Sequence, residues 1–172
     1  MATAVITAVC VWTSFTTNTA PPPNAFAAGF YHMGGTRGTS PLYVVRINGT
    51  GQVPAFGWQR TRHSVIVHGV RGFDDIHYED NVLAEILTCK GLDKVTMRWV
   101  QYNSMVDMER CVQLGRNNNG EKIYLARILI EDHPPAKTYL PATFVPSSGL
   151  AITEHYGTYA TDCFMVFCGI IS

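Results

Sequence analysis

The segment PLYVVRI (residues 41–47) returns later in the chain as KIYLARI (residues 122–128). The tyrosines Tyr43 and Tyr124 are 81 residues apart, and the arginines three positions further along keep the same offset. Both segments are short, apolar and bounded by turn-forming residues, as expected of buried β-strands. The chain therefore contains two copies of one unit, and a fold prediction has to start from that repeat.

The repeat extends on both sides of these strands. Trp12 pairs with Trp99, and Gly29 pairs with Gly115, at slightly larger offsets. The difference in offset predicts a polar, Gly-rich insert at residues 32–39 of the first copy, as is typical of a surface loop.

We place the first repeat at residues 9–87 and the second at residues 94–169 of a single domain, residues 1–172. Each copy is about as small as an independent fold can be, so the two copies are expected to share one core. Tyr43, Arg46 and their second-copy equivalents are interpreted as structural, because residues three apart on a strand face opposite sides.

The composition favours strands over helices, with 15 Gly, 9 Pro, 8 Tyr and 8 Phe among 172 residues. We expect an all-β fold of two pseudo-symmetric tandem repeats, built from short antiparallel strands. A short helical turn is expected at Asp80 to Leu87 alone. The clearest expected strands are Ala2 to Trp12, Leu42 to Ile47, Ser64 to His68, Lys94 to Tyr102, Lys122 to Ile130 and Cys163 to Ile171.

Charge and motifs exclude several classes of protein. Lys+Arg and Asp+Glu are both 13, so the net charge is zero, and neither nucleic acid nor an integral membrane segment is expected. No nucleophile elbow, phosphate loop or dinucleotide motif is present, so the chain is expected to be no enzyme and to need no cofactor. The acidic stretch Asp74 to Asp80 lacks calcium-loop spacing and is expected to be a solvated loop, with no metal site.

The cysteines are odd in number and include no C-x-x-C pair. We expect buried free thiols in a reducing compartment, and hence a cytoplasmic location, with secretion as the alternative. The five cysteines are Cys10, Cys89, Cys111, Cys163 and Cys168.

The order of the motifs along the chain resembles that of the DM-nine repeat family. This family includes two-repeat mannose-binding lectins of bivalves and a module of natterin-type toxins. The resemblance covers nearly the whole chain. Its pieces are a Trp, a Pro-rich stretch, a Gly-rich turn, an L-Y-V-x-R strand, an acidic loop, a Pro-x-Lys loop and a closing strand. In the second copy these include Trp99, Leu114-Gly115, Gly120, Ile123 to Arg127, Pro135 to Lys137 and Phe164.

The resemblance implies a sugar site in the second copy. Asn117 stands where the family has an Asp, Lys137 stands at the family's Lys, and Glu131 stands at an acidic position between them. In the first copy the corresponding positions hold Tyr31 and Phe56, so that site is expected to be lost or altered.

The chemistry of these residue types suits a sugar, whose hydroxyls need amides, carboxylates and a cation as partners. We therefore take Asn117, Asn119, Glu131 and Lys137 as the candidate carbohydrate-binding residues. The Asn turn and the Lys loop lie at opposite ends of one strand, so they meet only if a chain reversal returns the loop. Without the resemblance, the Asn run is interpreted simply as a turn.

Two functions follow as expectations. The first is a lectin that recognises mannose-type glycans in innate immunity, acting as a homodimer, as the resemblance implies. The second is a non-lectin β scaffold or protein-interaction module whose sugar site has decayed. Lys137 discriminates between them: an exposed lysine beside Asn117 favours sugar binding, and a distant, solvated lysine favours decay.

Overall fold

The computed structural model describes residues 9–17, 19–32, 39–47, 55–61, 64–71, 74–78, 83–91, 97–133, 136–154 and 158–169. These residues form fourteen strands and two short 3-10 helices, without an α-helix among them. The predicted all-β fold is confirmed. Within this described part, no helix is long and apolar enough to cross a membrane.

The strands follow each other in two groups of seven. The first group is β1 (Val9–Thr16), β2 (Ala27–His32), β3 (Thr39–Ile47), β4 (Ala55–Thr61), β5 (Ser64–Arg71), β6 (Asp74–Tyr78) and β7 (Leu83–Lys90). The second group is β8 (Met97–Gln101), β9 (Gln113–Arg116), β10 (Lys122–His133), β11 (Ala136–Val145), β12 (Leu150–Glu154), β13 (Thr158–Thr161) and β14 (Met165–Gly169). The 3-10 helices are η2 (Met108–Arg110) and η3 (Pro146–Ser148).

The two groups have the same antiparallel pairing. In the first, β1 pairs with β7, β7 with β3, and β2 to β6 pair in succession. In the second, β8 pairs with β14, β14 with β10, and β9 to β13 pair in succession. In the described residues, each half therefore forms the same seven-strand unit.

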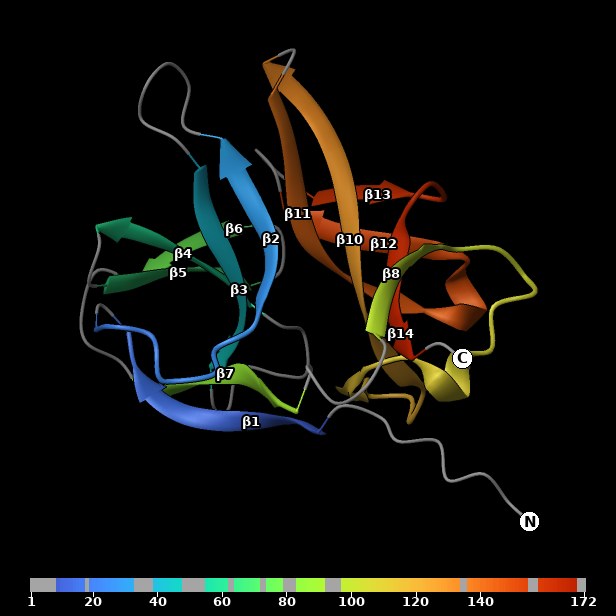
Figure 1. Ribbon diagram of the computed structural model, residues 1–172, viewed down its shortest axis with the longest axis horizontal. Coiled ribbons are helices and arrows are strands. Elements are labelled where there is room, and N and C mark those ends of the chain that lie inside the picture. The colour runs from blue at the N-terminus through green and yellow to red at the C-terminus, as the bar shows by residue number, and fades with distance from the viewer. Residues whose placement is uncertain are drawn as a thin grey trace.

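One pair of strands joins the halves into a single sheet. β2 of the first half pairs with β11 of the second, with Phe30 opposite Tyr139. Figure 1 shows β2, β11 and β10 side by side, with β3 to β6 on one flank and β12 and β13 on the other. We call this β2–β11 junction the seam.

The seam requires a glycine. A Cβ on Gly29 would lie 2.0 Å from the carbonyl oxygen of Tyr139 and 2.9 Å from Pro141 Cδ. Gly29 is therefore needed for the close approach of the two backbones, because any side chain would push the strands apart.

The core has three parts. One cluster belongs to the first half and includes Phe15 and Tyr43, and a second belongs to the second half and includes Tyr124 and Phe144. The third cluster mixes both halves. Its buried members are Ala28, Val44, Leu87, Cys89, Val112, Leu114, Ile123, Leu125 and Phe167.

The two repeat tryptophans both pack against this shared cluster. Trp12 of the first half donates from Nε1 to the carbonyl oxygen of Leu114 in the second half, at 2.9 Å. Trp99 of the second half stacks on Phe26 of the first, with ring centroids 6.4 Å apart. Each tryptophan thus fastens its own half to the other.

Two local expectations are wrong. The segment expected as a helical turn at Asp80 to Leu87 enters β7, whose residues from 83 onward are extended. Ile86 faces the first-half cluster and Leu87 the shared one, so both faces are apolar and the strand shows no clean alternation. Asp74–Tyr78 is strand β6, where a loop was expected.

The cysteine expectation is also wrong. Cys10 is bonded to Cys89 across β1 and β7, and Cys111 is bonded to Cys168. Only Cys163 is free, and it is exposed. The bonded cysteines were not recognised because strand register, which brings each pair together, cannot be read from spacing alone.

Candidate functional site

The Asn run is a tight turn between β9 and β10, and the side chain of Asn117 forms its hydrogen bonds within this turn. Its Oδ1 accepts from the backbone N–H groups of Asn119 at 3.0 Å and Glu121 at 2.9 Å. Its Nδ2 donates to Glu121 Oε1 at 3.1 Å. Gly120 closes the turn at φ 77°, a left-handed conformation that favours glycine. Asn117 therefore holds the turn together and has both polar ends occupied.

Glu121 extends this network to the next element. Its second carboxylate oxygen accepts a hydrogen bond from the hydroxyl of Ser147 in η3. The hydrogen bonds from Ser147 and Asn117 lower the pKa of Glu121 below its ordinary value. The carboxylate thus acts as an acceptor that fixes the turn against η3.

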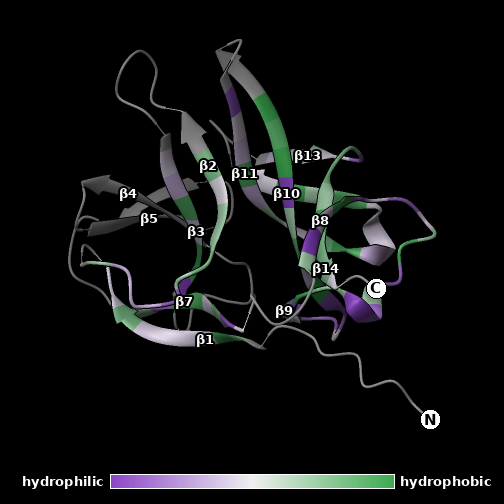
Figure 2. Cartoon of the chain, in the orientation of Figure 1, coloured by the Kyte–Doolittle hydropathy of each residue, from purple (hydrophilic) through white to green (hydrophobic). Residues whose placement is uncertain are grey.

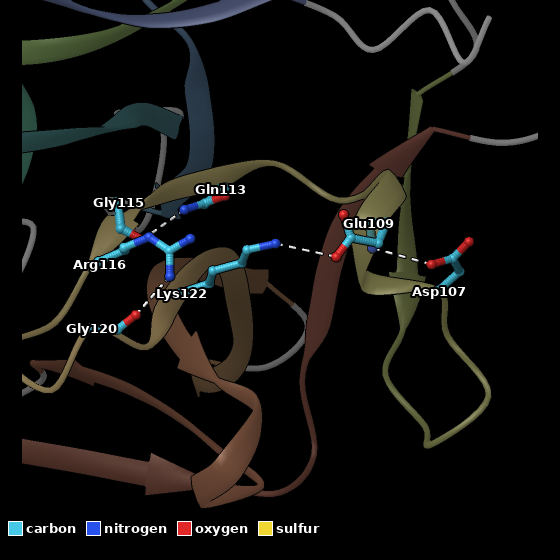
Figure 3. Close-up of polar contacts among 7 residues, drawn as sticks. All are labelled: Asp107, Glu109, Gln113, Gly115, Arg116, Gly120 and Lys122. Atoms are coloured by element: carbon cyan, nitrogen blue, oxygen red, sulfur yellow. Dashed lines mark hydrogen bonds and ion pairs between the residues drawn. The ribbon is translucent and has the colours of Figure 1, made fainter.

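Two cations flank this turn, and both are engaged (Figure 3). Arg116 donates from Nη1 to the carbonyl oxygen of Gly120 at 2.7 Å. Lys122 lies 3.2 Å from Glu109 Oε1, in η2. Sequence reasoning chose Lys137 as the cation of the candidate site and missed Arg116 and Lys122, although both are close to Asn117 in the chain.

The structure does not bring Lys137 to Asn117. Lys137 is exposed at the start of β11, while Asn117 precedes the start of β10, and the two strands are antiparallel. The nine residues Lys122 to Ile130 alone span about 30 Å of strand. The pairing of Phe30 with Tyr139 instead places Lys137 level with the end of β2.

The other candidate residues fall at different places. Glu131 lies in the last part of β10, on the arm that leads to Lys137, and Asn119 lies in the turn with Asn117. Tyr31 is near the end of β2, and Phe56 is in β4; the side chains of Glu131, Tyr31 and Phe56 lie outside the described part. The four candidates therefore form two separated groups, and their sugar binding stays a prediction.

A different pair of sites emerges from the repeated arginines. The Arg46 guanidinium lies over the Trp12 ring at 4.4 Å, and the Arg127 guanidinium lies over the Trp99 ring, also at 4.4 Å. Such cation–π contacts stabilise by about 0.5–2 kcal/mol. Each half thus carries the same stacked arginine and tryptophan.

The two arginines differ in their remaining partners. Arg46 donates from Nε to Glu85 Oε2 at 2.5 Å, and its Nη2 is the same distance from that oxygen. Glu85 is directly opposite Arg46 in the β3–β7 pair. In the matching β10–β14 pair, Met165 is opposite Arg127. The second half therefore has a thioether where the first half has a carboxylate.

Arg127 is left with an unpaired donor. Its Nε is buried and has no hydrogen-bond partner among the described residues, and within them its Nη2 reaches only Met165 Sδ, at 3.7 Å. The Tyr139 ring also lies against the guanidinium, with its centroid 4.2 Å away. Burial lowers the pKa of Arg127 below its ordinary value, although an arginine stays charged. An unpaired buried donor of this kind is costly, so the position is one where a ligand acceptor would be favoured.

Exposed apolar side chains line the seam beside Arg127. Phe30, Tyr139 and Leu129 are successive partners across β2, β11 and β10, so they share one face and form a continuous row. Phe30 is 42% and Leu129 41% exposed. Figure 2 shows hydrophobic residues (green) along β2 and the upper part of β10. We call Phe30, Tyr139 and Leu129 the seam row.

Sequence reasoning missed both features. It singled out Arg127 but interpreted it as structural, and it gave Met165 no role. The signal was present, because aligning the last strands of the two copies sets Met165 against Glu85 at an offset of 80 residues. The seam row had no signal, because it depends on pairing between strands of different copies.

Comparison with known proteins supports the fold. No protein-family model matches the chain, and no curated protein matches it in sequence. The chain is similar in structure to the nematode sperm cell motility protein MFP2B, with a TM-score of 0.61 and 10% identity. The match covers 95% of this chain and 46% of that one, so this chain spans about half the neighbour's length. The similarity shows a shared β fold, and membership of the DM-nine family stays a prediction.

Proposed function

We propose that the protein is a non-catalytic interaction module that binds a polypeptide partner across the seam. The seam row carries this proposal, because Phe30 and Leu129 are exposed on either side of the partly exposed Tyr139, and contiguous apolar side chains at a surface are typical of protein-binding sites. The row joins strands from both halves, so the surface exists only when the two copies are assembled. The occupied side chain of Asn117 and its separation from Lys137 support the non-lectin alternative.

A selection experiment tests this proposal. A displayed peptide library is selected on the wild-type protein, and the bound peptides are titrated by calorimetry against Phe30→Ser and Leu129→Ser. Each variant is expected to weaken binding by about tenfold, as loss of an apolar anchor does. Leu83→Ser is the matched control, because Leu83 is 60% exposed in β7, which pairs with β1 and β3 instead. Equal binding by all three variants would contradict the proposal.

Sugar binding is the second candidate. The exposure of Lys137 and its position level with the end of β2 favour a site shared between the copies over one within the second copy. A glycan array on wild type and Lys137→Ala tests this. The lectin function would be established by mannose-specific binding that Lys137→Ala abolishes and that a chelator leaves intact. An array without mannose signal would contradict the lectin function.

Self-association and cellular location are two further proposals. A homodimer is expected to appear as a species of twice 19.0 kDa in light scattering, and a single 19.0 kDa species would contradict it.

The expectation of a cytoplasmic location depends on the cysteines being free thiols. The two disulfides support the secreted alternative, because disulfides persist in oxidising compartments.

A further inference from the structure

The two stacked arginines show which chemical group the second half lacks. Around Arg46, one carboxylate from Glu85 accepts from the guanidinium while Trp12 covers its face. Around Arg127, the described residues provide the aromatic faces but no acceptor for Nε. The same pair of strands therefore provides a carboxylate for the arginine in the first half and none for the arginine in the second.

We propose that Arg127 binds the carboxylate of a ligand that also carries an apolar or aromatic group. This carboxylate takes the place in the second half that Glu85 takes in the first. The inference deepens the proposed interaction module and rests on it only for the apolar part of the ligand. Leu129 connects the site at Arg127 with the seam row, since it lies two residues from Arg127 on the same face of β10.

The side chain of Met165 has to move for a carboxylate to reach Arg127. It is only partly buried, and its unbranched thioether changes rotamer readily. When Met165 turns aside, the Nε–H and the Nη2–H of Arg127 point in parallel to one place. A carboxylate accepts such a pair of donors through its two oxygens.

A second polar side chain lies in the same row. Gln101 of β8 is directly opposite Met165 of β14, so Gln101, Met165 and Arg127 face the same side across three neighbouring strands. The Gln101 amide is exposed, and among the described residues it donates only a long contact to Cys163 Sγ, at 3.8 Å. It is thus placed to donate to the free edge of a bound carboxylate.

The aromatic surroundings favour a carboxylate with an apolar body. The rings of Trp99 and Tyr139 both lie against the guanidinium, so they would shield a carboxylate bound there from water. A flat organic acid can place its ring against these side chains while its carboxylate reaches Arg127. Inorganic phosphate offers no such apolar part.

Benzoate is the probe, and the arginine Nε–H signals in ¹H–¹⁵N NMR spectra are the readout. Benzoate is expected to shift the Arg127 Nε–H signal to lower field in a saturable way and to leave Arg46 unchanged. Benzamide, the neutral isostere, and inorganic phosphate at equal ionic strength are expected to produce no such shift. A shift with benzamide, an equal shift with phosphate, or no shift with benzoate would overturn the proposal.

Two variants at position 165 sharpen the result. Met165→Glu supplies an internal carboxylate, so the Arg127 signal should resemble that of Arg46 and should no longer respond to benzoate. Met165→Leu keeps the position apolar and should keep the response. An undiminished response in a folded Met165→Glu would overturn the proposal, and the benzoate and benzamide comparison on wild type decides the matter if that variant does not fold.

This experiment is independent of the peptide selection. If benzoate binds and no peptide is selected, the carboxylate site stands while the interaction module fails. If peptides bind the seam row and benzoate does not shift Arg127, the module stands and the carboxylate site fails.

Discussion

The two halves of this protein have the same seven-strand pairing, yet they treat the same arginine differently. In the first half, Arg46 is held by Trp12 and by the carboxylate of Glu85. In the second, Arg127 is held by Trp99 and Tyr139, and Met165 replaces the carboxylate. The comparison teaches that a repeat can preserve a scaffold interaction in one copy while the other copy frees the same group for binding.

The largest expected effect concerns the disulfides, which the halves place differently. Cys10–Cys89 closes 79 residues and Cys111–Cys168 closes 57. From the loop lengths, replacing either pair by Ala should lower the free energy of unfolding by about 4 kcal/mol, with the two losses within a few tenths of each other. Urea unfolding of both double variants measures this.

Cys163→Ser is the matched control for these variants, because its thiol is free and exposed. It should leave the urea midpoint unchanged. A loss at Cys163→Ser as large as that of either pair would contradict the assigned pairing.

The next largest effect concerns the seam glycine. Gly29→Ala should cost about 3 kcal/mol, because its Cβ would lie 2.0 Å from the carbonyl oxygen of Tyr139. Gly115, its equivalent in the second half, has open space around the Cβ position but a φ of 149°. Gly115→Ala should therefore cost only about 1 kcal/mol, from backbone strain. Thermal unfolding of both variants separates them, and equal losses would contradict the close approach at the seam.

A smaller effect is expected at the closed arginine. Glu85→Met gives the first half the arrangement of the second and leaves Arg46 without its carboxylate. Because the pair is only partly buried, the free energy of unfolding should fall by about 1–2 kcal/mol. Glu109→Met is a matched control, since Glu109 is an exposed partner of Lys122 and should change stability by less than about 0.5 kcal/mol. Equal losses in the two variants would show that Arg46 and Glu85 contribute nothing particular.

The sequence allowed us to predict the all-β class and the equivalence of Trp12 and Trp99 in the two copies, because strand-like runs and repeated residues are local signals. It did not reveal the disulfide Cys10–Cys89, since those cysteines meet only through the β1–β7 register. The candidate sugar residues were grouped by the family resemblance and by their residue types, and the long strand β10 separates Asn117 from Lys137. The open site at Arg127 required knowing that Met165 stands opposite it.

The smallest effect depends on pH and concerns a turn in the second half. Hydrogen bonds lower the pKa of Glu121, so the charged form is favoured in the folded protein. Its contribution to stability is present above the ordinary glutamate pKa and is lost as the pH falls through the lower, folded-state pKa. Ser147→Ala removes the largest cause and should raise the pKa of Glu121, as followed by ¹³C NMR of the carboxyl carbon. An unchanged pKa would contradict the Glu121–Ser147 contact.

The most direct test of the central claim is the free energy of unfolding of Met165→Glu. If Arg127 lacks an internal acceptor, the new carboxylate should reproduce the Arg46–Glu85 pair and raise stability by about 1 kcal/mol. Met165→Gln, which has nearly the same shape without the charge, should give a smaller gain. A folded Met165→Glu that is no more stable than Met165→Gln, or less stable than wild type, would contradict the claim that the second half leaves its arginine open.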